Sequence, residues 1–192
     1  ILLFAVIIFS PLIVLAADEV CSSCSHQVSV NGSFTHRRDN PSVAVAGVMG
    51  DPAVYREDVN GTNFTVTISA LPAGKYTVVI GAAETVAGAA GERVFDVTVG
   101  DQVLAKNFDI IAAAGAPRKV ATITGTIEKE DDALRGPVRI SFVARQGTAK
   151  FNTVDLKNAE GASVVSFSAS ELADAFSAAA VRVPDIKEPT IW

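Results

Sequence analysis

Short runs of alternating apolar and polar residues recur through the middle of the chain. Residues 64–68 (FTVTI) alternate in this way, Leu71-Pro72-Ala73-Gly74 interrupts the pattern, and residues 76–80 (YTVVI) resume it. A period of two is typical of half-buried strands, and a proline close to a glycine is typical of a turn. Further runs of this kind predict strands at residues 94–99, 102–106, 120–127, 138–144 and 149–156.

Seven short strands with almost no helical periodicity between them predict an all-β fold, an antiparallel sandwich of the jelly-roll type. Gly100-Asp101 separates two of the strands, and a glycine at the first central position suits a type II′ hairpin turn. The strands before and after this turn are therefore expected to pair with each other. Parallel α/β folds are excluded, because they need helices between their strands.

The segment before the strands is polar and contains several turn signals. Asn31-Gly32, Asn40-Pro41 and Asp51-Pro52 are all dipeptides that favour turns or loops. We therefore expect a loop region with short strands at most, at residues 27–30 and 43–48. The resulting domain organisation is a linker and loop region at 18–50, the sandwich at 51–160, and a C-terminal segment at 161–192.

The first seventeen residues form one uncharged apolar run, interrupted only by Pro11. As a helix it spans roughly 26 Å, slightly less than a hydrocarbon core of about 30 Å. Val14-Leu15-Ala16 also resembles a signal-peptidase site, which would make the run a removable signal. We favour a retained membrane anchor, which places the rest of the chain on the periplasmic, extracellular or lumenal side.

Cys21 and Cys24 directly follow the apolar run. In an oxidising compartment a local disulfide between them is expected. Covalent haem attachment requires a histidine directly after the second cysteine, and position 25 is serine. A zinc site would need His26 and His36 as the remaining ligands, at an unusual spacing. We expect no metal and no cofactor.

The C-terminal segment is predicted to contain a short helix and an extended arm. Ser168-Ala169-Ser170-Glu171 has the form of a capping box, and helical spacing follows it to about residue 180. Pro184 and Pro189 keep residues 183–192 extended. Large apolar residues on such an arm are suited to docking on a partner subunit. The candidates are Ile186, Ile191 and Trp192.

Charge and motifs exclude two classes of function. Charged residues make up 19% of the chain and the net charge is -5, so no basic face is available for nucleic acid. The sequence contains no Gly-x-Ser-x-Gly, no His-Glu-x-x-His and no phosphate-binding glycine loop before a helix. We therefore expect a protein that is not an enzyme.

Three sequons for N-linked glycosylation occur, at Asn31, Asn60 and Asn63. The sequence does not show whether the chain enters a glycosylating pathway. At this level we interpret the three sequons as chance or as turn chemistry.

Four blocks of sequence resemble malectin-like domains. The first runs from Gly74 and Tyr76 to Ala83-Glu84, and the second is Gly91-Glu92-Arg93-Val94-Phe95-Asp96-Val97. Residues 107–115 and 147–156 are similar to later strands of that family. The resemblance covers roughly residues 51–160, and it implies a malectin-like β-sandwich.

The resemblance also implies a binding function. The family binds glucose-rich oligosaccharides or serves as an extracellular interaction module, and its sugar site includes aromatic rings directly after the Ala-Glu pair. Here Glu84 is followed by Thr85-Val86, so the rings are absent. The ligand-binding candidates are Tyr55, Arg56, Glu84 and Asp155. A structural alternative is that Glu84, Arg93 and Asp96 bind one another and nearby loop amides.

We expect an accessory subunit that docks on other membrane proteins, because the stacking rings are missing while an anchor and an apolar arm are present. The alternative is a carbohydrate-binding module for a glucan or other oligosaccharide.

Overall fold

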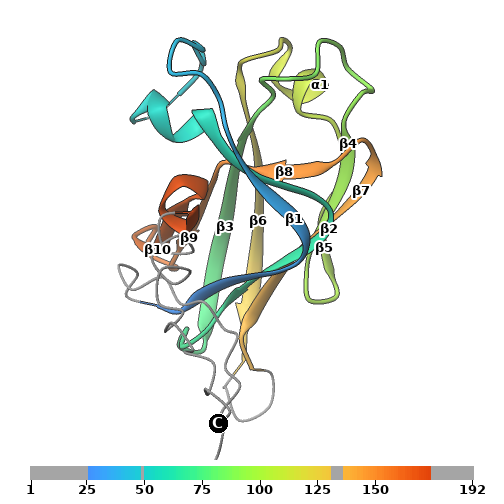
Figure 1. Cartoon of the computed structure of the whole chain (residues 1–192). Coiled ribbons are helices and arrows are strands. Elements are labelled where there is room, and N and C mark those ends of the chain that lie inside the picture. The colour runs from blue at the N-terminus through green and yellow to red at the C-terminus, as the bar shows by residue number, and fades with distance from the viewer. Residues whose placement is uncertain (1–25, 49, 131–135, 174–192) are drawn as a thin grey trace, which may run out of the picture.

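The computed structural model describes residues 26–48, 50–130 and 136–173, and two antiparallel sheets packed face to face make up most of it (Figure 1). The six-stranded sheet has the order β1 (Val28–Arg38), β2 (Glu57–Ile68), β7 (Val138–Gln146), β4 (Val94–Val99) and β5 (Gln102–Phe108), with β8 (Ala149–Phe151) also paired to β2. The four-stranded sheet has the order β10 (Ser163–Ser168), β9 (Thr153–Lys157), β3 (Gly74–Ala83) and β6 (Val120–Lys129). The expected all-β sandwich is confirmed.

The core lies between the two sheets and is filled by the apolar half of each alternating strand. Phe64 on β2 stacks on Phe142 on β7, with ring centroids 4.7 Å apart. Phe151 lies 5.4 Å from Phe142 and meets Phe167 of the other sheet edge-on at 6.3 Å. Such aromatic contacts add to the burial of apolar area, so this row of rings joins the two sheets.

The hairpin predicted at Gly100-Asp101 is confirmed. Val99 pairs with Gln102, and Gly100 has φ 54°. A positive φ at the first of two turn residues is the feature for which a type II′ turn selects glycine.

The segment before residue 51 differs from expectation. Instead of a loop with a short strand, β1 runs for eleven residues and pairs along its whole length with β2. Asn31-Gly32 lies inside this strand. Glycine is needed at position 32, because a Cβ there would fall 2.5 Å from the carbonyl oxygen of Asn63. The glycine permits a close approach of two strands, so its interpretation as a turn signal was wrong. Residues 43–48 form only an isolated bridge, from Ala46 to Lys119.

The strand predicted at 149–156 is divided at Asn152, where the chain passes from β8 in one sheet to β9 in the other. Asn152 is fully buried, and its Nδ2 donates to the carbonyl oxygens of Tyr55 (3.1 Å) and Glu57 (2.7 Å). Its Oδ1 accepts a hydrogen bond from the backbone N–H of Ala83 (2.8 Å). One side chain therefore connects β3, the start of β2 and the crossover between the sheets.

The short helices have sequence causes. The side chain of Asp109 caps α1 (Ile110–Ala114) by accepting from Ala112 N at 3.0 Å, and Gly115 ends it at φ 79°. This helix was not expected from the sequence. The expected capping box is confirmed, because Glu171 Oε2 accepts from Ser168 N (2.7 Å) and Glu171 N donates to Ser168 Oγ (3.3 Å). The structure describes this helix over residues 169–173.

Several expectations fall on residues that the structure does not describe. They are the anchor at 1–17, the disulfide of Cys21 and Cys24, and the docking residues Ile186, Ile191 and Trp192. Across 26–48, 50–130 and 136–173, no helix is both long enough and apolar enough to cross a membrane.

Candidate functional site

One end of the sandwich, which we call the loop end, gathers η1 (Pro52–Arg56), the segment 84–93 and α1 with the residues that follow it (Figure 1). Backbone hydrogen bonds join these segments. Ala46 N donates to Arg118 O at 2.8 Å, and Arg118 N donates to Glu84 O at 2.7 Å. The loops at this end are therefore attached to one another as well as to the sheets.

Charged side chains are buried beneath the loop end. Lys150 on β8 has no exposed surface, and its Nζ lies 2.7 Å from Oδ2 of Asp58, which is 1% exposed. The guanidinium of Arg37 pairs with the same carboxylate, and Asn60 Nδ2 donates to its other oxygen at 2.7 Å. Burial alone would raise the pKa of Asp58, but Lys150, Arg37 and Asn60 together hold it below its ordinary value.

Glu84 extends this set of charges to the loop at 85–90. Its Oε1 accepts hydrogen bonds from Val86 N (2.8 Å) and Ala87 N (2.9 Å), and its Oε2 pairs with Arg93. Burial would raise the pKa of Glu84, but the nearby Lys150, the two amides and Arg93 lower it below the ordinary value. We refer to Arg37, Asp58, Glu84, Arg93 and Lys150 as the ion network.

The ion network determines what the loop end exposes. Its carboxylates bind internal partners, whereas the loop at 85–90 consists of one threonine followed by valine, alanine and glycine. Val86, near the start of this loop, is 63% exposed. The loop is also fixed by Glu92, whose Oε2 accepts from Gly88 N at 3.0 Å. The site therefore presents a small apolar side chain on a backbone that the buried Glu84 and the exposed Glu92 hold in place.

The four predicted ligand residues do not converge on one cavity. Tyr55 is the buried residue of η1, and a Cβ on Gly81 of β3 would come within 2.8 Å of its hydroxyl. Arg56 donates from Nε to the carbonyl oxygen of Val43 (3.0 Å). Asp155 lies on the outer face of β9 and accepts from Ser163 Oγ at 2.6 Å. Only Glu84 belongs to the ion network, so their joint role in ligand binding stays a prediction.

The structural alternative for the strand-end charges is partly confirmed. Glu84 and Arg93 do pair, and Glu84 does bind loop amides. Asp96 instead accepts from Arg145 on β7 (2.6 and 2.9 Å) and from Asn107 N (2.7 Å).

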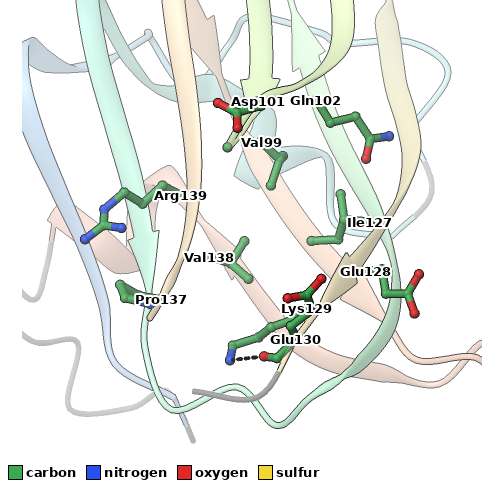
Figure 2. A pocket seen from close by; sticks show the side chains of 11 residues that line it. Val99, Asp101, Gln102, Ile127, Glu128, Lys129, Glu130, Pro137, Val138 and Arg139 are labelled. Carbon is green, nitrogen blue, oxygen red and sulfur yellow. Dashed lines mark hydrogen bonds between the residues drawn. The ribbon is translucent and has the colours of Figure 1, made fainter. Parts of the chain in front are cut away.

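Two depressions lie away from the ion network. One of about 420 Å³ lies between η1, β9 and β10, and its carboxylates include Asp51 and Glu171, which cap helices. The other, of about 410 Å³, lies where the β4–β5 hairpin meets the end of β6 and the start of β7. Figure 2 shows Val99, Ile127 and Val138 turned toward its centre and charged residues around it.

The ion network and the depressions also lack the grouping of a metal centre. Within the described ranges, no three His, Cys, Asp or Glu side chains are grouped to hold a metal ion. The ionised groups of the ion network bind one another at short range. This arrangement suits a structural support for a surface.

Sequence reasoning did not find Lys150, Asp58 or Asn152. No sequence signal identified Lys150, because a lysine between Ala149 and Phe151 fits the ordinary alternation of a half-buried strand. No local signal identifies its partner, since Asp58 is 92 positions away.

Comparison with known proteins agrees with the fold. The extracellular domain of ANXUR2 from Arabidopsis thaliana matches with a TM-score of 0.59 and 10% identity, over 67% of this chain and 40% of that one. The extracellular domain of ANXUR1 matches at 0.57 and 12%, over 66% and 38%. A Bacteroides uniformis beta-glucuronidase matches at 0.55 and 13%, over 69% and 14%. Such identities show the fold alone, and the chain spans less than half the length of each structure.

No curated protein sequence matches the chain. The family model of the malectin domain matches residues 24–158, a range that includes β1 through β9 and the ion network. This match covers more than half of the chain, and it confirms the resemblance seen in the four sequence blocks. The chain belongs to the malectin-domain family.

Proposed function

We propose that this chain is a non-catalytic interaction module that docks on a membrane protein outside the cytoplasm, with its loop end as part of the contact surface. Malectin-like domains are generally binding modules rather than catalysts. The question for this chain is therefore which class of ligand it binds, a protein or a carbohydrate.

The observation that carries the proposal is the loop at 85–90. Glu84 fixes its backbone through Val86 N and Ala87 N, and the side chain of Val86 is 63% exposed. A rigid loop loses little conformational entropy on binding, so it is suited to docking on a preformed surface. Small apolar side chains at the centre of a contact exclude water without offering hydrogen bonds to sugar hydroxyls.

The carbohydrate alternative receives less support from the same residues. Sugar recognition needs flat aromatic faces together with polar groups that orient hydroxyls. Thr85 and Val86 stand where the family places its ring pair, and Tyr55 is buried. The buried carboxylates of Asp58 and Glu84 are engaged in the ion network.

The location is inferred from relatives and from the sequence. ANXUR1 and ANXUR2 match through parts described as extracellular domains. An anchor at residues 1–17 and an arm carrying Ile186, Ile191 and Trp192 would hold the module close to a membrane partner. Both features remain predictions from the sequence.

Replacing Val86 with aspartate is expected to weaken partner binding at least tenfold, equivalent to about 1.4 kcal/mol, because it places a charge in a desolvated contact. The partner is first identified by affinity purification from native membranes in mild detergent, and its affinity is then measured with purified proteins. Val103→Asp is the matched control, since Val103 is 58% exposed on β5 and lies outside the loop end. Equal affinities for the two variants would remove the loop end from the proposal.

Glucose-type oligosaccharides are expected to bind more weakly than about 1 mM, or less than about 4 kcal/mol. Titration calorimetry of the whole chain with maltose and longer glucans measures this directly. Micromolar binding that is abolished by Tyr55→Phe or Asp155→Asn would reverse the ranking in favour of the carbohydrate module.

A further inference from the structure

Two of the three sequons lie side by side on the outer face of the six-stranded sheet. Asn31 on β1 is paired with Thr65 on β2, and Ser33 on β1 is paired with Asn63 on β2. Residues two apart in a strand share a face, and directly paired residues share it too. Phe64 and Val66 point into the core, so all four of these sequon residues point outward.

The fold does not explain the two asparagines. Asn31 and Asn63 are both exposed, and within the described ranges neither carboxamide has a hydrogen-bond partner. Asparagine is also depleted in strands, because its side chain competes with the backbone for hydrogen bonds. The glycine between Asn31 and Ser33 is required by the approach of β2, but this requirement does not extend to its neighbours.

The third sequon differs in each of these respects. Asn60 is half-buried, its Nδ2 donates to Asp58 Oδ1 at 2.7 Å, and its Oδ1 accepts from Thr35 Oγ1 at 3.4 Å. A glycan on this nitrogen would leave it a single hydrogen and would place a sugar ring next to Asp58, at the edge of the ion network. Molecules modified at Asn60 would therefore fold poorly.

We propose that Asn31 and Asn63, but not Asn60, are acceptors of N-linked glycans. In this reaction Nδ2 attacks C1 of an oligosaccharide carried on a polyprenyl diphosphate. The new bond is C1–Nδ2, the C1–oxygen bond to the diphosphate breaks, the amide loses one proton, and the polyprenyl diphosphate leaves. Modification of the native chain rests on the extracytoplasmic placement in the proposed function. Glycans at Asn31 and Asn63 would cover the β1–β2 face and leave the loop end open to a partner.

The test expresses the full chain in cultured animal cells behind a host secretion leader, with a reporter sequon on a C-terminal linker. Protein recovered from both the medium and the membranes is treated with peptide-N-glycosidase in ¹⁸O-water, and peptide mass spectrometry identifies each asparagine converted to labelled aspartate. We expect label at Asn31 and Asn63 and none at Asn60. Asn31→Gln and Asn63→Gln should each remove one glycan, and Asn60→Gln should remove none.

Ser33→Ala destroys the first sequon, so it removes the Asn31 glycan while leaving that asparagine in place. Because Ser33 is exposed, this substitution should have little effect on folding. Unlabelled Asn31 and Asn63 beside a labelled reporter would overturn the inference, and so would label at Asn60 in folded protein. The added leader makes this outcome independent of where the native chain resides. Failure of the partner-binding test would likewise leave the glycan result unchanged, so the two proposals can fail separately.

Discussion

Replacing Asp58 with alanine is expected to lower the free energy of unfolding by about 3–5 kcal/mol, the range for breaking a buried ion pair by removing one partner. Lys150 would lose the carboxylate 2.7 Å from its ammonium, and Arg37 would lose the same group. Because Lys150 has no exposed surface, water cannot replace that partner. Urea denaturation of the purified variant measures the loss.

Lys150→Met should cost about half of that loss or less, and this ordering tests the cause. Burial already lowers the pKa of Lys150, although Asp58 opposes the effect, so removing the ammonium also removes a desolvation penalty. Asp58 would still bind Arg37 and Asn60. Asp101→Ala, at an exposed turn, is the control and should change the free energy by less than about 0.5 kcal/mol. A larger loss for Lys150→Met than for Asp58→Ala would contradict this account.

The same prediction has a pH signature. Asp58 and Glu84 have folded-state pKa values below their ordinary ones. Their contribution to stability is therefore complete above the unfolded-state pKa of about 4, and it is lost as the pH falls through the folded-state values. Asp58→Ala should flatten the acid side of the stability profile and leave the neutral side parallel to that of the unsubstituted protein.

Gly61→Ala is the second large change, with an expected loss of about 3 kcal/mol or more in the free energy of unfolding. A Cβ at this position would lie 1.9 Å from the carbonyl oxygen of Ser33 and 2.8 Å from Cα of Phe34. Both are backbone atoms of β1, so a change of rotamer cannot relieve the overlap. The paired strands would have to separate at the bulge between Ser33 and Phe34.

Gly88→Ala is the matched control for this substitution. No atom lies within 4 Å of a Cβ on Gly88, so alanine there should change stability by less than about 0.5 kcal/mol. Thermal and urea unfolding of the two variants provide the comparison. If Gly61→Ala cost less than about 1 kcal/mol, the close approach of β1 and β2 in the structure would be incorrect.

Part of the candidate site was available from the sequence. The missing rings directly follow Glu84, and Arg93, which pairs with Glu84, is only nine residues away in the next block of family-like sequence. Asp58 and Lys150 are 92 residues apart, and no local period relates them. Tyr55 was identified by its position in the family pattern, but its burial depends on Gly81 in a different strand.

The sequence by itself determined the elements whose causes are local. Alternation specified strands such as 64–68, and a glycine specified the hairpin at Gly100. Ser168 with Glu171 specified the start of a helix. Each of these signals lies within a few residues of the element that it determines. Only the tertiary structure decided that Asn31-Gly32 runs through a strand, because the cause is the backbone of β2 some thirty residues later. The same reason applies to the ion network. A buried charge is stable only beside its partner, and the partner is selected by the packing of strands that are distant in the chain.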